Sequence, residues 1–99
     1  MAGGVRSDYR GVLTYFVQAG KEGPIKIGRS KNPVKRMKTI QADSWLDCFL
    51  LGLSTEREKY LHERFKQHHI RGEWFSPSNE ILEYISSLEP IEDALKRIS

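Results

Sequence analysis

The chain has 99 residues, of which 38% are hydrophobic and 29% charged, and its formal net charge is +3. This length suits one small domain, and the composition is that of a soluble globular protein rather than a disordered chain. No apolar run is long enough to span a membrane, the N-terminus lacks the apolar core of a signal peptide, and the single cysteine, Cys48, cannot form an internal disulfide, so a reducing cytoplasm is the expected compartment.

The charge is unevenly distributed along the chain. Between Lys21 and Lys38 there are seven Lys or Arg residues and one Glu, a local balance of +6. Between Glu80 and Arg97 there are five acids and two bases, a balance of −3. A local cationic excess favours binding of a polyanion, although such a run is more often only a solvated surface.

The N-terminal part predicts a flexible lead-in followed by a β-hairpin. Residues 1–10 carry no clear pattern, and the domain is expected to begin at residue 11 and to run to residue 88. Residues 11–19 (GVLTYFVQA) are rich in β-branched and aromatic side chains, which predicts a strand. Residues 20–24 combine glycines with a proline, so a tight turn should pair this strand antiparallel with the next.

The second strand leads into a helix. It begins at Ile25, alternates apolar with polar residues, and is expected to close at Gly28, where a missing side chain lets a ligand or another strand approach. Asn32 and Pro33 match an N-cap and a first helical residue, because proline lacks only an N–H that would be unpaired there. A helix over 33–41 is predicted.

A third strand and a second helix follow. Residues 45–53 (WLDCFLLGL) are largely apolar, which predicts a central strand buried on both faces. Thr55 and Glu58 have the spacing of a capping box, so a helix is expected from there to about Gln67. Because Glu58 and His62 are four residues apart, they share one face of that helix.

The C-terminal part completes an α+β domain. Residues 71–75 predict a turn into a short strand, and Ser76 with Pro77 starts a helix. Its expected inner face is formed by Ile81, Leu82 and Ile85. Residues 89–99 predict a last helix, packed on the same domain, with the stripe Ile91, Leu95 and Ile98. The predicted fold class is α+β, with a small three-stranded, mainly antiparallel sheet covered by helices and an extra C-terminal helix.

Four side chains have the chemistry of a metal-and-phosphate site. Glu58 could hold a hard cation, and the fork of Arg36 could grip phosphoryl oxygens. Tyr15 or His62 could move the proton of an attacking water. The residues alone leave other readings open: Glu58 as half of its capping box, His62 as a helix-surface residue, and Tyr15 as ordinary strand packing.

Four sequence blocks occur in a fixed order. They are Tyr15-Phe16-Val17, residues 26–36 (KIGRSKNPVKR), residues 58–65 (EKYLHERF) and residues 72–75 (GEWF). In this order they resemble the GIY-YIG nuclease superfamily, in particular its compact phage and bacterial branch, whose members are often described only as DNA-binding domains. The resemblance covers residues 13–85, and four ordered blocks are far more specific than any one of them.

The resemblance implies a DNA endonuclease that uses a single Mg²⁺ or Mn²⁺ ion. Glu58 falls on the metal-binding glutamate of the family and Arg36 on its catalytic arginine, and water would be activated near Tyr15. The implied catalytic residues are Tyr15, Lys26, Arg36, Glu58 and His62, with Gly28 and Glu73 as further motif positions. The cations expected to contact DNA are Lys26, Arg29, Lys31, Lys35, Arg36 and Lys38.

The chain also departs from the family pattern. Leu13 stands where a glycine is expected, and the late asparagine has no clear counterpart, since Asn79 is an unconvincing substitute and Glu73 only lies nearby in order. Lys26 replaces the tyrosine of the second motif, and a lysine can bind phosphate but is a poor general base. A non-catalytic DNA-binding module with the same fold is therefore the alternative.

Several points about the partners stay open at this level. A third reading is an interaction domain whose acidic C-terminal helices dock a partner. The nucleic acid is expected to be DNA, whether single-stranded, duplex or branched, and a homodimer or a fused or separate targeting module is a further alternative. Few aromatic residues lie within the basic run, so no base-stacking platform is expected there.

Overall fold

The computed structural model describes residues 11–98, and the predicted lead-in over 1–10 lies outside this range. In chain order the elements are β1 (Leu13–Ala19), β2 (Ile25–Ser30), α1 (Pro33–Ala42), β3 (Cys48–Ser54), α2 (Glu58–Arg64), the 3-10 helix η1 (Lys66–His68), β4 (His69–Arg71), β5 (Trp74–Phe75), α3 (Asn79–Ser86) and α4 (Ile91–Ile98). None of the helices described is long and apolar enough to cross a membrane.

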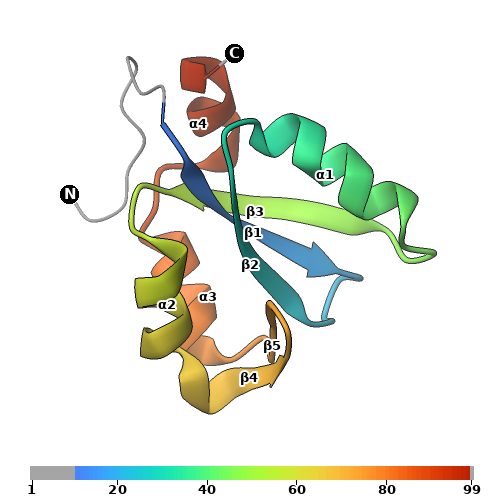
Figure 1. Cartoon of the computed structure of the whole chain (residues 1–99), viewed down its shortest axis with the longest axis vertical. Helices are drawn as coiled ribbons and strands as arrows, with labels where there is room; N and C mark the ends of the chain where they lie inside the picture. The colour runs from blue at the N-terminus through green and yellow to red at the C-terminus, as the bar shows by residue number, and fades with distance from the viewer. Residues whose placement is uncertain (1–10, 99) are drawn as a thin grey trace.

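The strands form one sheet in the order β3-β1-β2-β5-β4, and every neighbouring pair is antiparallel (Figure 1). The α+β class, the antiparallel pairing and the hairpin of β1 with β2 are confirmed. The prediction of three strands is wrong, because the sheet has five. The short strand predicted within residues 71–75 is present as β5, whereas β4, with three residues, is too short to produce a readable alternation of apolar and polar residues and was not predicted.

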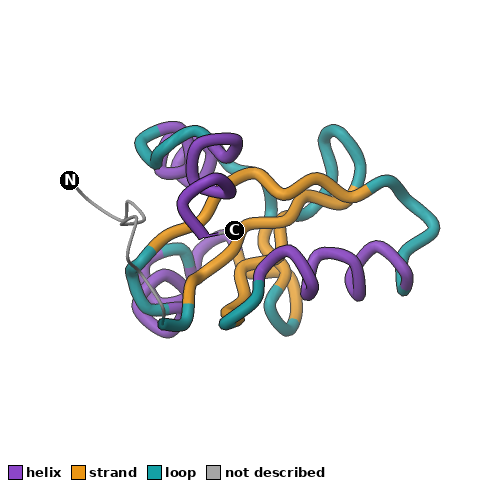
Figure 2. Tube along the Cα trace, turned by 90° about the horizontal axis from the view of Figure 1, so that it is seen from above, coloured by secondary structure: helices purple, strands orange, loops and turns teal. Residues whose placement is uncertain are grey.

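Helices cover both faces of the sheet, and β1 supplies side chains to both. Tyr15 and Val17 point to the core on the side of α1 and α4, whereas Phe16 points to the core on the side of α2 and α3. Figure 1 shows α1 and α4 above the sheet and α2 and α3 below it, and Figure 2 looks down on the α1 and α4 side. The fully buried β1 strand is therefore the centre of the fold.

The start of α1 is encoded locally, as predicted. The Asn32 side chain accepts a hydrogen bond from the backbone N–H of Lys35 at 3.1 Å, and Pro33 is the first helical residue. The preceding strand does not close at Gly28 but continues to Ser30, with Gly28 paired to Tyr15 of β1.

The third strand differs most from its prediction. β3 begins at Cys48 and lies at the edge of the sheet rather than in its centre. Phe49 is 39% exposed, and Trp45, which was expected inside the strand, is 94% exposed in the preceding loop. A largely apolar run is typical of a central strand. Here the run belongs to an edge strand, and its apolar side chains pack against α4 on one face.

The capping box predicted for α2 does not form. Arg57 is the N-cap, and it makes no side-chain capping bond. The loop before the helix is instead held by the Ser54 hydroxyl, which accepts a hydrogen bond from the backbone N–H of Glu56 at 3.0 Å. Glu58 is thus the first residue of α2, and its carboxylate is not used as the reciprocal half of a box. The helix ends at Arg64, earlier than expected.

The inner face of α3 is also rotated from its prediction. Ser78 caps the helix by accepting from the backbone N–H of Ile81, and Ile81 and Tyr84 are its buried residues. Leu82 is 40% exposed, so its assignment to the inner face is wrong. In α4, the predicted stripe of Ile91, Leu95 and Ile98 packs against the core next to the buried Ala94.

A pair of leucine substitutions tests these faces. Leu61 is the one buried residue of α2, so Leu61→Ala should lower the free energy of unfolding by about 2–5 kcal/mol through lost packing and a cavity. Leu82→Ala should change it by less than about 0.5 kcal/mol, since the side chain is largely solvated. Urea unfolding of both variants measures the difference, and equal losses would contradict the assignment of the two faces.

Candidate active site

The site is built on a close approach between Tyr15 and Gly28. The two residues face each other in the β1–β2 ladder, and Tyr15 is only 1% exposed. A Cβ atom added to Gly28 would lie 2.3 Å from the Tyr15 hydroxyl oxygen and 2.5 Å from ring atom Cζ. Such distances are far inside van der Waals contact, so only glycine lets the Tyr15 ring cross β2.

The edge of β2 opens next to this crossing. The register of β5 pairs it only with Ile25 and Lys26, and beyond them the backbone N–H of Ile27 donates to the Glu73 carbonyl at 2.9 Å. The Ile27 carbonyl lies 2.8 Å from Nε2 of His62. Because a carbonyl can only accept, Nε2 carries the proton and donates. His62 thereby fastens α2 to β2 at the rim of the site.

Glu73 occupies the middle of the site. It follows Gly72, whose φ of +55° supports the turn between β4 and β5. Its Oε1 lies 3.0 Å from the position of a Cβ on Gly28 and 3.7 Å from Nζ of Lys26. The sequence marked Glu73 as a motif residue without a clear role. Its central position depends on the pairing of β5 with β4 and with β2, and the turn and short strand predicted over residues 71–75 do not specify this pairing.

Arg36 reaches the same point from α1. Its Nε donates a hydrogen bond to the Tyr15 hydroxyl at 3.4 Å, which leaves the other guanidinium N–H groups available for an anion. Glu58 approaches from the opposite side, and its Oε1 lies 3.8 Å from Nε2 of His62. The structure therefore brings together Tyr15, Lys26, Gly28, Arg36, Glu58, His62 and Glu73 from five segments of the chain.

Burial and a second carboxylate nearby disfavour the ionised form of Glu58. Burial raises the pKa of Glu58, and the neighbouring Glu73 raises it further, against a lowering by His62 and Arg29. Burial is also the main cause that raises the pKa of Tyr15, with a lowering by its hydrogen bond to Arg36 and a further rise from Glu73. Tyr15 therefore keeps its proton at neutral pH. Positive charge added beside Glu58 and Glu73 would favour the ionised form of Glu58.

The donor set fits one hard divalent cation held mainly by the substrate and water. Mg²⁺ is commonly bound through one or two carboxylates plus waters and phosphate oxygens, and Glu58 and Glu73 supply such a pair. Among residues 11–98 there is no group of three or more His, Cys, Asp or Glu residues arranged as a complete metal site. Glu58 is thus the candidate ligand, with Glu73 beside it.

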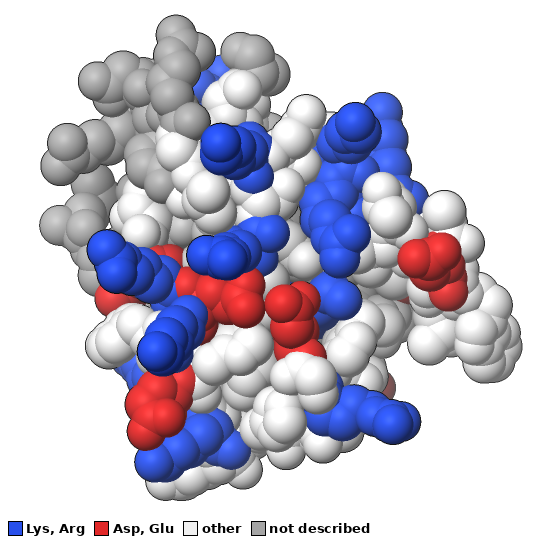
Figure 3. Space-filling model, viewed as in Figure 1, with Lys and Arg blue, Asp and Glu red and all other residues white. Residues whose placement is uncertain are grey.

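Cations surround this acidic centre. Figure 3 shows acidic side chains in the middle of the face, with Lys and Arg side chains above them and to both sides. Arg29 lies close enough to Glu58 to lower its pKa and lines a cleft with it. Lys31, Lys35 and Lys38 are exposed around the start of α1 and take no part in the central cluster. They remain predicted DNA contacts.

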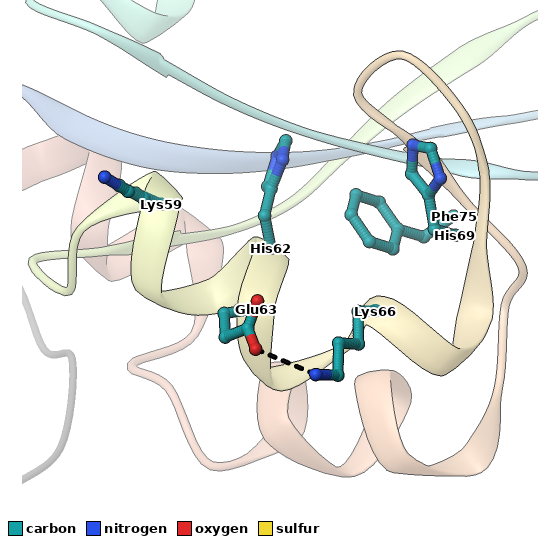
Figure 4. A pocket seen from close by; sticks show the side chains of 6 residues that line it. All are labelled: Lys59, His62, Glu63, Lys66, His69 and Phe75. Atoms are coloured by element: carbon teal, nitrogen blue, oxygen red, sulfur yellow. Dashed lines mark hydrogen bonds and ion pairs between the residues drawn. The ribbon is translucent and has the colours of Figure 1, made fainter.

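A second basic cleft lies below β2, between α2 and the β4–β5 hairpin. It is lined by Lys59, His62, Glu63, Lys66, His69 and Phe75 (Figure 4). The rings of His62 and His69 pack edge-on against Phe75 at centroid distances of 4.9 and 5.3 Å. The sequence did not mark Lys59, Lys66 or His69, because they lie outside the basic run between Lys21 and Lys38.

A polar network fixes the loop that carries Glu58. The Tyr84 hydroxyl donates to Glu56 Oε1 at 2.5 Å and lies 2.8 Å from the Ser54 hydroxyl. The Thr14 hydroxyl donates to the backbone carbonyl of Glu56 at 2.6 Å. The network joins β1, β3 and α3 to the residue two positions before Glu58. It was not predicted, because its members are separated by up to seventy positions of chain and share no motif.

The comparisons with known proteins gave one result. A family model described as the T5orf172 domain matches residues 11–99. The comparison with curated proteins found no match, and neither did the comparison with solved structures. The matched region contains every residue of the site described above.

The Glu58→Gln substitution separates a functional carboxylate from a capping one. Because the folded-state pKa of Glu58 is raised, ionisation above that pKa costs folding free energy, so the glutamine variant should be more stable than the parent at pH 7. The difference should shrink as the pH falls below the ordinary glutamate pKa, where both states of the parent bind the proton. Urea unfolding at neutral and acidic pH measures it, with the exposed Glu83→Gln as control. A capping role would reverse the sign at pH 7.

Proposed function

The chain belongs to the T5orf172 domain family, and from that premise we propose that it is a metal-dependent DNA endonuclease of the GIY-YIG type. The observation that carries the proposal is the meeting of Tyr15, Arg36, Glu58 and Glu73 around Gly28. Four residues far apart in the sequence, all within the blocks that resemble GIY-YIG nucleases, contribute to one polar cluster. Two carboxylates close together do not stabilise the packing of the fold, so their proximity favours a functional role.

Arg36 and Lys26 bind the phosphate in this proposal. Arg36 is held by its hydrogen bond to Tyr15, so its remaining N–H groups form a fixed fork for two phosphoryl oxygens. Lys26 lies 3.7 Å from Glu73 with only 17% of its side chain exposed. It supplies a second positive charge from the position where the family has a tyrosine, and it substitutes for that tyrosine as an anion ligand rather than as a base.

Glu58 would hold the metal, and Glu73 would add negative charge beside it without binding it. When bound, Mg²⁺ or Mn²⁺ polarises the phosphoryl group and stabilises the charge on the leaving oxygen. The two carboxylates, drawn together by the fold against their mutual repulsion, supply the negative charge that attracts the cation. The first-turn position of Glu58 and the bond from His62 to β2 keep this carboxylate at the open edge of the sheet.

Tyr15 orients the attacking water, and Glu73 accepts its proton. With its pKa raised, the Tyr15 hydroxyl is protonated at neutral pH, so it donates a hydrogen bond instead of acting as a resident base. Glu73 is the carboxylate that lies closest to the same point above Gly28. His62 uses its Nε2 proton on the Ile27 carbonyl and so acts as a positioning residue.

Cleavage assays with the Glu58 and Arg36 variants test the proposal. Single-stranded, duplex and branched DNA incubated with Mg²⁺ or Mn²⁺ should be cut by the parent protein and left intact when EDTA is present. Glu58→Gln should lower the rate by about 100-fold or more, because the main metal ligand is lost. Arg36→Lys should lower it by a similar factor, since lysine keeps the charge but lacks the fork.

The exposed Glu83→Gln on α3 is the matched control and should cleave at the parental rate. Binding of DNA without cleavage of any substrate in either metal would contradict the endonuclease. Equal rates for the parent and Glu58→Gln would do the same, because they would show that the acidic pair takes no part in the reaction.

A non-catalytic DNA-binding module is the second candidate, favoured by the ion pair of Lys26 with Glu73 in place of the expected tyrosine. In that case the logarithm of the affinity still falls linearly with the logarithm of the salt concentration, through release of counterions. Lys35→Ala should reduce the slope by about one, as expected for one lost phosphate contact. Fluorescence anisotropy across a salt series measures this slope for both candidates, and only metal-dependent cleavage separates them.

A further inference from the structure

We propose that the cleft between α1 and β5 binds an unpaired nucleobase next to the scissile phosphate. The cleft has a volume of about 400 Å³ and is lined by both tryptophans of the chain, Trp45 and Trp74. It also contains Lys26 and Arg36, the two cations of the site above. The inference rests on the proposed function and adds the substrate class, which is a single-stranded or extrahelical nucleotide.

Both tryptophans lie outside the basic run in the sequence. No stacking platform was expected there, because the aromatic residues of the sequence lie elsewhere. The fold brings two aromatic residues next to it: Trp45 follows the C-terminal end of α1, and Trp74 pairs with Lys26 across the β2–β5 ladder. Aromatic faces next to cations are the combination by which proteins hold single-stranded nucleic acid, because every base can stack.

Trp45 is exposed but anchored. At 94% exposure its indole gains almost nothing from the core, which is unusual for a tryptophan. Its loop is held by the Gln41 side chain, whose Nε2 donates to the Leu46 carbonyl at 2.9 Å and whose Oε1 accepts from the Cys48 backbone N–H at 2.7 Å. These bonds hold the backbone of the loop that places Trp45 in the lining of the cleft.

Trp74 links the cleft to the reacting centre. Nζ of Lys26 lies 5.5 Å from the centroid of the Trp74 ring, a cation–π distance, and Glu73 is its direct neighbour in the chain. A nucleotide whose phosphate contacts Lys26 and Arg36 would thus carry its base toward the cleft. Because Lys26 and Arg36 would already bind the phosphate, the part of the substrate left to enter the cleft is the neighbouring nucleoside.

The charge of the cleft argues for a base and against a second phosphate. Its lining also contains Asp43, whose backbone N–H caps α1 and whose carboxylate is close enough to Arg36 to help raise the pKa of that guanidinium. A phosphate would be repelled there, whereas a neutral base would not. Since a base in a duplex has both faces covered by its neighbours, it must be unpaired or turned out of the stack to enter.

Tryptophan fluorescence reports directly on this cleft, because both tryptophans line it. In EDTA, which prevents cleavage, a short oligothymidylate should quench the emission. An abasic oligomer with the same number of phosphates should not quench it and should bind about tenfold more weakly. A blunt duplex should bind without the quench. Equal affinity and equal quenching for the base-carrying and abasic strands would overturn the proposal.

A variant pair completes the experiment. Trp45→Ala should weaken binding of oligothymidylate about tenfold and leave binding of the abasic strand unchanged. Tyr60→Ala removes another exposed aromatic ring, 52% exposed on α2 and outside the cleft, and should alter neither. If Trp45→Ala bound oligothymidylate as the parent does, the nucleobase site would be refuted.

The outcome is independent of the test for cleavage. Metal-dependent cleavage without any preference for base-carrying single strands would refute the nucleobase site and leave the endonuclease in place. Base-dependent quenching in a protein that cuts no substrate would support the nucleobase site while contradicting the nuclease proposal.

Discussion

The crossing of the Tyr15 ring over the backbone of Gly28 is the constraint on which the site depends. It requires a residue without Cβ in the middle of β2, and it brings the hydroxyl of a buried strand to the edge of the sheet. Arg36 is positioned by that hydroxyl, and Glu73 lies against the same glycine. A strand interior is a costly place for glycine, so the arrangement is explained by what crosses it rather than by sheet stability.

The electrostatics of the site oppose folding and favour binding. Glu58 lies at the start of α2 and Glu73 in the β4–β5 turn. Burial and the nearby Glu73 raise the pKa of Glu58, and His62 and Arg29 lower it. The pair of carboxylates would favour a nearby cation, while the surrounding Lys and Arg side chains would favour a polyanion. A phosphodiester bound together with a metal ion, as proposed above, would interact favourably with both the carboxylates and the surrounding cations.

The sequence predicted those features that depend on neighbouring residues. The hairpin, the Asn32 cap with Pro33, and the apolar stripe of α4 are local patterns, and the structure has them. The five-stranded sheet, the edge position of β3 and the place of Glu73 depend on contacts between distant segments, which periodicity cannot report. The capping box failed for a related reason: the Ser54 hydroxyl and the Tyr84 network hold the loop before α2, so the helix begins later than the pattern indicated.

The hairpin that carries Glu73 has only a small attachment to the rest of the sheet. β5 is two residues long, and its ladder with β2 pairs only Ile25 with Phe75 and Lys26 with Trp74. Phe75 is its main buried anchor, while all three residues of β4 are exposed. Such a segment opens at a lower free energy than the central strands. A ligand that contacts Glu73 and Trp74 would oppose this opening, so the affinity for that ligand and the stability of the hairpin would be thermodynamically linked.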